Sequence, residues 1–189
     1  MKSFNWLLVL SVLSCIGCSS PVHEDDRGCA FVSDSIQYRV EFMSAGCVRI
    51  LSFPEGDTLV TRRLVVDSEK PAFKDYKWED TGQKLLFRTH ELSVVFDKAD
   101  AAFIFQETST GKLLLKEKGD RKARNFKRSV AGGEQCLEVT QRFVPTEDEA
   151  IYGLGQYQNG IMNYRGKSVL LLQANMDIVN PFLISTNGY

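Results

Sequence analysis

The sequence is poor in the residues on which many catalytic and metal sites depend. It has only two histidines in 189 residues, His23 and His90, so a Ser-His-Asp triad or a histidine-based metal site would have to use a single suitable imidazole. We interpret His90, which lies between two expected strands, as a turn residue. Cys15 and Cys18 have C-x₂-C spacing, but no second pair of ligands at zinc-site spacing accompanies them, and Gly153-Leu-Gly155 lacks the third glycine, preceding strand and following helix of a dinucleotide fingerprint. The sequence therefore predicts no metal and no cofactor.

Charge of one sign is also lacking. The chain has 23 basic and 24 acidic residues and a formal net charge of −1, so nothing indicates a nucleic-acid partner. A basic run spans residues 116–128, which we interpret as a solvated loop, with contact to a polyanion as the alternative. The contents of 43% hydrophobic and 25% charged residues are ordinary for a globular protein and favour one domain.

No apolar run is long enough to cross a bilayer as a helix. The longest candidate, Trp6–Leu13, follows the basic Lys2 and precedes small residues, which is the pattern of a signal peptide. We expect residues 1–18 to be a lipoprotein signal peptide and lipobox. Cys18, preceded by Gly17, is the predicted lipid attachment site.

Two other interpretations of this region remain. Cys15 is the alternative anchor, because Val12 occupies its −3 position, and an ordinary secretory signal with incidental cysteines is a third possibility. Acylation would make the membrane a partner and would place an exported protein on the cell envelope. Residues 19–29 are expected to form a polar tether. Three cysteines then remain, which allows one disulfide at most, and we expect Cys47 and Cys136 to be buried.

From Ala30 onward the hydrophobic pattern has a period of two. Ile36–Phe42 places four apolar side chains on one face, and no twelve-residue stretch has a helical stripe. Many short strands separated by turns are typical of an antiparallel sandwich or barrel. The further expected strands are 48–53, 59–66, 73–78, 84–88, 92–96, 102–106, 112–115, 136–143, 168–173 and 182–185.

The end of the chain is expected to be half of a hairpin. Pro181–Ser185 predicts a strand, Thr186–Gly188 a turn, and Tyr189 the start of a return strand. Because a missing partner strand would leave a row of backbone groups unpaired, we expect the chain to be a truncated piece of a longer protein.

The segment 149–189 carries the most specific pattern. It contains Tyr152-Gly-Leu-Gly155, Arg165-Gly166, Asn175-Met-Asp177, Pro181-Phe182 and Gly188-Tyr189 in this order. Five such elements in order resemble the N-terminal domain of glycoside hydrolase family 31, in which Tyr-Gly-Leu-Gly forms a turn. Upstream segments from residue 30 resemble the same domain. The alternative is an unrelated β-sandwich in which Tyr-Gly-Leu-Gly occurs by coincidence.

The resemblance implies an all-β fold, an antiparallel galactose-mutarotase-like β-sandwich over residues 30–189. It also implies that the catalytic (β/α)₈ barrel, with both catalytic aspartates, is absent from this chain. In the family, the aspartate of the Asn-x-Asp segment contacts sugar hydroxyls, a role that carries over to Asp177 alone. A carboxylate can accept two hydroxyl hydrogen bonds, although Asp177 could instead cap its own turn.

The resemblance also suggests a substrate class. The sequence departs from the common pattern at Gln156, where many relatives have glutamate, and the stretch that follows is most similar to α-xylosidases acting on xyloglucan oligosaccharides. The implied partner is an α-linked oligosaccharide. Tyr157 and Tyr164 could contact sugar or the barrel, and Trp78 is expected to pack in the core. A self-sufficient, lipid-anchored glycan-binding module is the alternative function, and a purely structural envelope lipoprotein is a third.

Overall fold

The computed structural model describes residues 22–57 and 72–189, and everything in this part of the chain is strand, turn or loop. Neither the expected signal peptide with Cys15 and Cys18 nor the strand expected at 59–66 lies within the described residues. None of these residues forms a helix long and apolar enough to cross a membrane.

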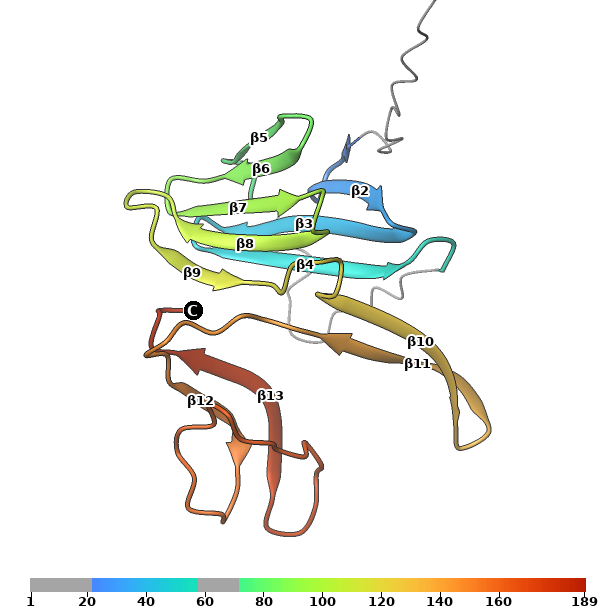
Figure 1. Cartoon of the computed structure of the whole chain (residues 1–189), viewed down its shortest axis with the longest axis vertical. Coiled ribbons are helices and arrows are strands. Elements are labelled where there is room, and N and C mark those ends of the chain that lie inside the picture. Colours follow the sequence, from blue (N-terminus) through green and yellow to red (C-terminus); the bar gives the residue numbers. More distant parts are fainter. Residues whose placement is uncertain (1–21, 58–71) are drawn as a thin grey trace, which may run out of the picture.

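Two antiparallel sheets form a sandwich (Figure 1). The four-stranded sheet has the order β1 (His23–Glu24), β2 (Cys29–Ser33), β3 (Ile36–Ser44), β4 (Cys47–Pro54). The five-stranded sheet has the order β5 (Lys77–Asp80), β6 (Lys84–Arg88), β7 (Leu92–Asp97), β8 (Ala102–Glu107), β9 (Leu113–Lys116). Each strand pairs with the next in sequence, so short turns suffice to connect most of them.

The core lies between these two sheets and is mainly aromatic. The alternation predicted for residues 36–42 is confirmed, because Tyr38, Val40 and Phe42 are all buried. Rings from both sheets pack together, as when Phe31 lies 4.8 Å from Phe96 between ring centroids. The fully buried side chains come from β2, β3, β6, β7 and β8, and they are Cys29, Tyr38, Val40, Phe42, Leu85, Phe87, Val94, Phe96 and Phe103.

Two hairpins extend beyond the sandwich (Figure 1). β10 (Arg124–Ala131) pairs with β11 (Glu134–Gln141), and β12 (Ile151–Gln156) pairs with β13 (Ile178–Ser185). The solvated loop predicted over the basic run is wrong from Arg124 onward, where the chain forms β10. Carboxylates also pair with several of these basic residues, including Arg121 with Asp34 and Arg128 with Asp57. These pairs lower the net charge that a polyanion would meet.

Several other expectations need correction. The segment 22–29 begins the fold rather than forming a tether, because Glu24 accepts hydrogen bonds from Trp78 Nε1 (2.8 Å) and the Tyr76 hydroxyl (3.0 Å). The burial expected for Cys47 and Cys136 is wrong. Both are exposed, since Cys47 begins β4 and Cys136 lies near the start of β11, next to the turns of their hairpins. Among the described cysteines, Cys29 is buried. All three are free thiols.

Some strands differ from those predicted from the sequence, mainly where an apolar segment pairs with no neighbouring strand. Residues 168–173 form no strand, and Leu170 is 79% exposed, so the apolar pattern there does not reflect burial in a sheet. The strand expected at 73–78 begins only at Lys77. The strand expected at 182–185 is the end of β13, which pairs with β12, and Tyr189 O accepts from Ser185 N at 2.8 Å in the turn that follows.

Candidate functional site

The β12–β13 hairpin carries the site residues that the sequence singled out. The Tyr-Gly-Leu-Gly segment is part of strand β12 rather than a turn. The ladder pairs Gly153 with Leu183 and resumes at Gly155 with Val179, so three residues of β13 oppose the single residue Leu154. This bulge contains Pro181, which has no N–H to donate to a ladder and is tolerated at irregular positions of this kind.

Glycine is required at the bulge for steric reasons. Gly155 has φ +115°, and a Cβ there would overlap the carbonyl oxygen of Ile178. Both β12 glycines therefore permit a close backbone approach that no other residue allows. Two non-glycine residues of this segment, Leu154 between the glycines (φ +66°) and Met176 in the turn before β13 (φ +73°), adopt the left-handed conformation. Such residues are uncommon and concentrate at ligand sites and tight turns.

A buried carboxylate fixes the base of the hairpin. Glu149 accepts hydrogen bonds from Ser185 Oγ (2.7 Å), from the Tyr189 hydroxyl and from Thr146 N (2.9 Å). Burial raises the pKa of Glu149, but these three donors and the charge of Arg165 outweigh it and hold the pKa below its usual value. Burial and the bond to Glu149 raise the pKa of Tyr189 to about 12. No local sequence pattern indicated this role of Glu149.

The loop between β12 and β13 is also attached to this base. Arg165 Nη1 donates to the carbonyl of Glu149 (2.9 Å) and to that of Thr146. Asn163 Oδ1 accepts from Ile151 N (3.1 Å) and Arg165 N (3.0 Å). The Arg-Gly pair of the motif is therefore structural here, since its guanidinium binds backbone carbonyls of this chain.

Asp177 lies at the far end of the hairpin, directly before β13. Its backbone closes a tight turn with Ala174 (N–H to O distances of 3.3 and 3.4 Å), and its carbonyl accepts from Gln173 Nε2 at 3.0 Å. Its carboxylate makes no hydrogen bond or ion pair within residues 22–57 and 72–189. The side chain is half-buried. Both carboxylate oxygens are thus available to accept hydrogen bonds from a ligand.

The aromatic residues considered for sugar contact or core packing lie in two separate parts of the structure. Tyr157 and Tyr164 lie in the hairpin loop and form an edge-to-face pair with centroids 6.5 Å apart. Trp78 packs against the sandwich core, as predicted, and its indole N–H is already bonded to Glu24. His90 is exposed between β6 and β7, which confirms it as a turn residue. The described residues contain no group of three or more potential metal ligands.

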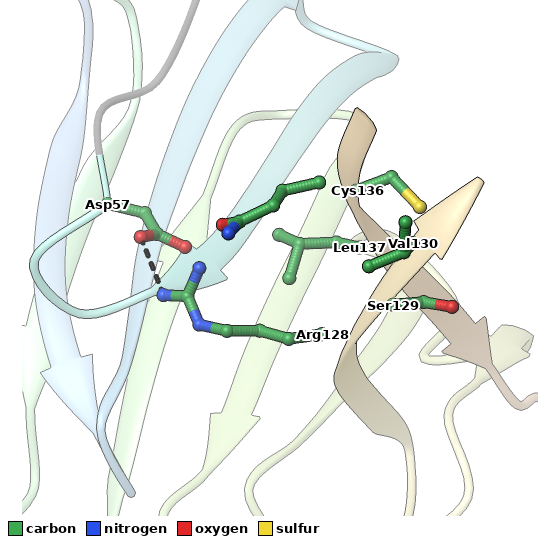
Figure 2. A pocket seen from close by; sticks show the side chains of 7 residues that line it. Asp57, Arg128, Ser129, Val130, Cys136 and Leu137 are labelled. Carbon is green, nitrogen blue, oxygen red and sulfur yellow. Dashed lines mark hydrogen bonds and ion pairs between the residues drawn. The ribbon is translucent and has the colours of Figure 1, made fainter. Parts of the chain in front are cut away.

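A pocket lies away from this hairpin, between the end of β4 and the β10–β11 hairpin (Figure 2). Arg128 and Asp57 form an ion pair there with an N–O distance of 3.0 Å. Because these two charges satisfy each other and the remaining lining carries no further charged side chain, we assign no site to it. The other lining residues are Ser129, Val130, Gln135, Cys136 and Leu137.

Comparison with protein families identifies the fold. Residues 37–187 match the glycosyl hydrolase 31 N-terminal galactose mutarotase-like domain. The chain belongs to this family. The antiparallel sandwich and the motif order therefore have a common explanation, and the galactose-mutarotase-like fold expected from the resemblance is confirmed.

The similar proteins are much longer than this chain. An α-xylosidase of Saccharolobus solfataricus is 31% identical over 170 residues, which cover 82% of this chain but 22% of that enzyme. An uncharacterized family 31 glucosidase of Pseudescherichia vulneris is 38% identical over 66 residues, covering 35% of this chain and 12% of that protein. This chain thus spans about a fifth of the α-xylosidase and less of the glucosidase.

Solved structures agree with the fold. A crystal structure of an α-xylosidase from Xanthomonas citri aligns with a TM-score of 0.75 at 28% identity, over 88% of this chain and 18% of that one. An α-xylosidase from a soil metagenome, complexed with xylose, aligns with a TM-score of 0.71 at 23% identity, over 89% of this chain and 27% of that one.

Proposed function

We propose that this chain is the accessory β-sandwich of an exported α-glycosidase of the α-xylosidase type and that Asp177 binds sugar hydroxyls for that enzyme. The observation that carries the proposal is that the carboxylate of Asp177, directly before β13, makes no hydrogen bond or ion pair among the described residues. The β12–β13 hairpin to which it belongs extends from the sandwich (Figure 1). The two α-xylosidases that are 31% and 28% identical to this chain support the substrate class.

The surface around the hairpin favours a domain of a larger enzyme over a self-sufficient binding module. Large apolar side chains are exposed there, among them Met162 at 78% and Phe182 at 59%. Contiguous apolar patches on a soluble protein usually mark a surface that another structure covers. A catalytic domain would cover this surface, and it would also supply the two catalytic carboxylates that a retaining glycosidase requires about 5 Å apart.

The test of Asp177 uses the enzyme that joins this chain to a catalytic barrel. Asp177→Asn keeps the size of the side chain but removes its charge, and hydrogen bonds to charged groups contribute about 1.5–3 kcal/mol. We expect kcat/KM on aryl α-xyloside to fall about ten- to a hundredfold, since about 1.4 kcal/mol is tenfold. Melting temperature should be nearly unchanged, because Asp177 forms no side-chain bond within the described fold. An unchanged kcat/KM with a lower melting temperature would make Asp177 a structural residue. The chain alone should show no turnover above a buffer blank.

We also propose that the protein is lipid-anchored through Cys18 at the cell envelope. The short apolar run before Gly17-Cys18 supports this. Cys18→Ala should abolish labelling by a radioactive fatty acid in cells and release the protein into the soluble fraction. Cys15→Ala is the matched control, and loss of label in that variant alone would move the anchor to Cys15.

A further inference from the structure

The β12–β13 ladder ends with a tyrosine and Asp177 at the same end. The last two ladder pairs are Gly155 with Val179 and Gln156 with Ile178. Tyr157 and Asp177 are the residues directly beyond the last pair, one on each side of the hairpin. The backbone positions of the aromatic ring and of the carboxylate therefore flank the same end of the ladder.

The Tyr157 ring is held in place from two sides. Its hydroxyl donates to the carbonyl oxygen of Leu154 at 2.9 Å, so the side chain folds back along β12, where Gly153 and Gly155 have no side chains to obstruct it. The edge-to-face contact with Tyr164, at an interplanar angle of 73°, supports it from the loop side. Tyr164 is itself buried, and its N–H donates to Ile151 O at 2.8 Å.

Its electrostatic surroundings agree with this placement. Burial, the neighbouring Tyr164 and the charge of Asp177 all raise the pKa of Tyr157. The hydroxyl stays neutral at physiological pH, and its O–H already donates a hydrogen bond to the carbonyl oxygen of Leu154. What the half-exposed side chain offers a ligand is therefore the apolar face of its ring.

We propose that Tyr157 is a second sugar-contacting residue of this site, whose ring packs against the C–H face of the pyranose that Asp177 holds by its hydroxyls. This inference rests on the proposed function of Asp177. A pyranose has an apolar face and a rim of hydroxyls, so a ring beside a carboxylate matches both parts of it. Small-ligand sites generally combine apolar walls with a few placed polar groups in this way.

The experiment titrates this chain with methyl α-D-xylopyranoside and follows backbone amide shifts by NMR. Contacts of an aromatic ring are worth about 0.5–1.5 kcal/mol beyond buried area, so Tyr157→Leu and Tyr157→Ala should raise the Kd about three- to tenfold. Tyr157→Phe keeps the ring and should stay within about twofold of wild type, since its hydroxyl points away from the sugar. Tyr152→Ala, which removes an exposed tyrosine at the other end of the β12 ladder, is the matched control and should change nothing.

The outcomes separate this inference from the proposed function. Weaker binding in Asp177→Asn together with unchanged binding in Tyr157→Leu overturns the role of Tyr157 and leaves that of Asp177 standing. Equal losses in Tyr157→Phe and Tyr157→Leu also overturn it, because the ring, which only the phenylalanine variant keeps, would then contribute nothing to binding. A wild-type chain that binds no xyloside, or an Asp177→Asn variant that binds like wild type, refutes the proposed sugar site as a whole. Leucine keeps an apolar side chain larger than that of alanine, so the comparison holds even where the alanine variant fails to fold.

Discussion

Glu117 and Arg124 form an ion pair inside the protein, and substitution of Glu117 tests how β10 is attached to the sandwich. Glu117 is 3% exposed and Arg124 is 8% exposed. Glu117 also accepts from Phe103 N (2.7 Å) and Gln141 Nε2 (3.1 Å), so a single carboxylate joins β8, β11 and the start of β10. Burial is the largest influence on the pKa of Glu117 and raises it, while Arg124 counteracts this effect.

The expected loss is large because Arg124 has little else to compensate its charge. Its guanidinium lies 5.1 Å from the Tyr38 ring centroid and 5.2 Å from that of Phe103, and its Nη1 has no hydrogen-bond partner among the described residues. Removing one partner of a buried pair costs about 3–5 kcal/mol. Glu117→Gln retains one oxygen, that of the new amide, as a hydrogen-bond acceptor. We therefore expect a loss of unfolding free energy at the lower end of this range, about 3 kcal/mol.

The assay is urea unfolding followed by tryptophan fluorescence, with Glu138→Gln as the matched control. Glu138 pairs with Lys127 on the same hairpin at 3.3 Å, but the side chains are 59% and 67% exposed, and exposed pairs are worth about 0–1 kcal/mol. A double variant, Glu117→Leu with Arg124→Leu, should recover much of the loss, because no unpaired charge stays buried. Equal small losses in Glu117→Gln and Glu138→Gln would refute the reasoning.

Two further predictions concern backbone sterics and pH. Gly155→Ala should abolish hydrogen-exchange protection along β13, because its Cβ would overlap Ile178 O. Gly166→Ala is the control: it has open space around it and should lower the unfolding free energy by only about 1 kcal/mol. Protection that persists in Gly155→Ala would contradict the close approach. The hydrogen bond from Arg39 lowers the pKa of Asp25 to about 2, so its stabilisation is present above about pH 4 and lost as pH falls toward 2. The unfolding free energies of wild type and Asp25→Asn should therefore differ at about pH 4 and above and converge as the pH falls toward about 2. A difference that stays constant with pH would exclude this linkage.

The sandwich could be predicted from local sequence because its strands are short, sequentially paired and alternating. The strand at 84–88 is found with the predicted bounds, and those at 92–96 and 102–106 extend by one residue. β10 was missed since its charged side chains mostly face solvent, so no apolar alternation marks it. The opposite error occurred at 168–173, where apolar residues stay exposed and form no strand.

The sequence by itself determined the fold class and the family, because turn residues, period-two alternation and an ordered set of motifs are local properties of a chain. It also singled out Asp177. Only the tertiary structure decided how the hairpin that carries that residue is built: the Pro181 bulge that shifts the register, the end of the ladder that Tyr157 and Asp177 flank, and the Glu149 cluster at the hairpin base. These features depend on cross-strand register and on contacts between residues 36 or more positions apart, such as Glu149 with Ser185, which local sequence patterns do not specify.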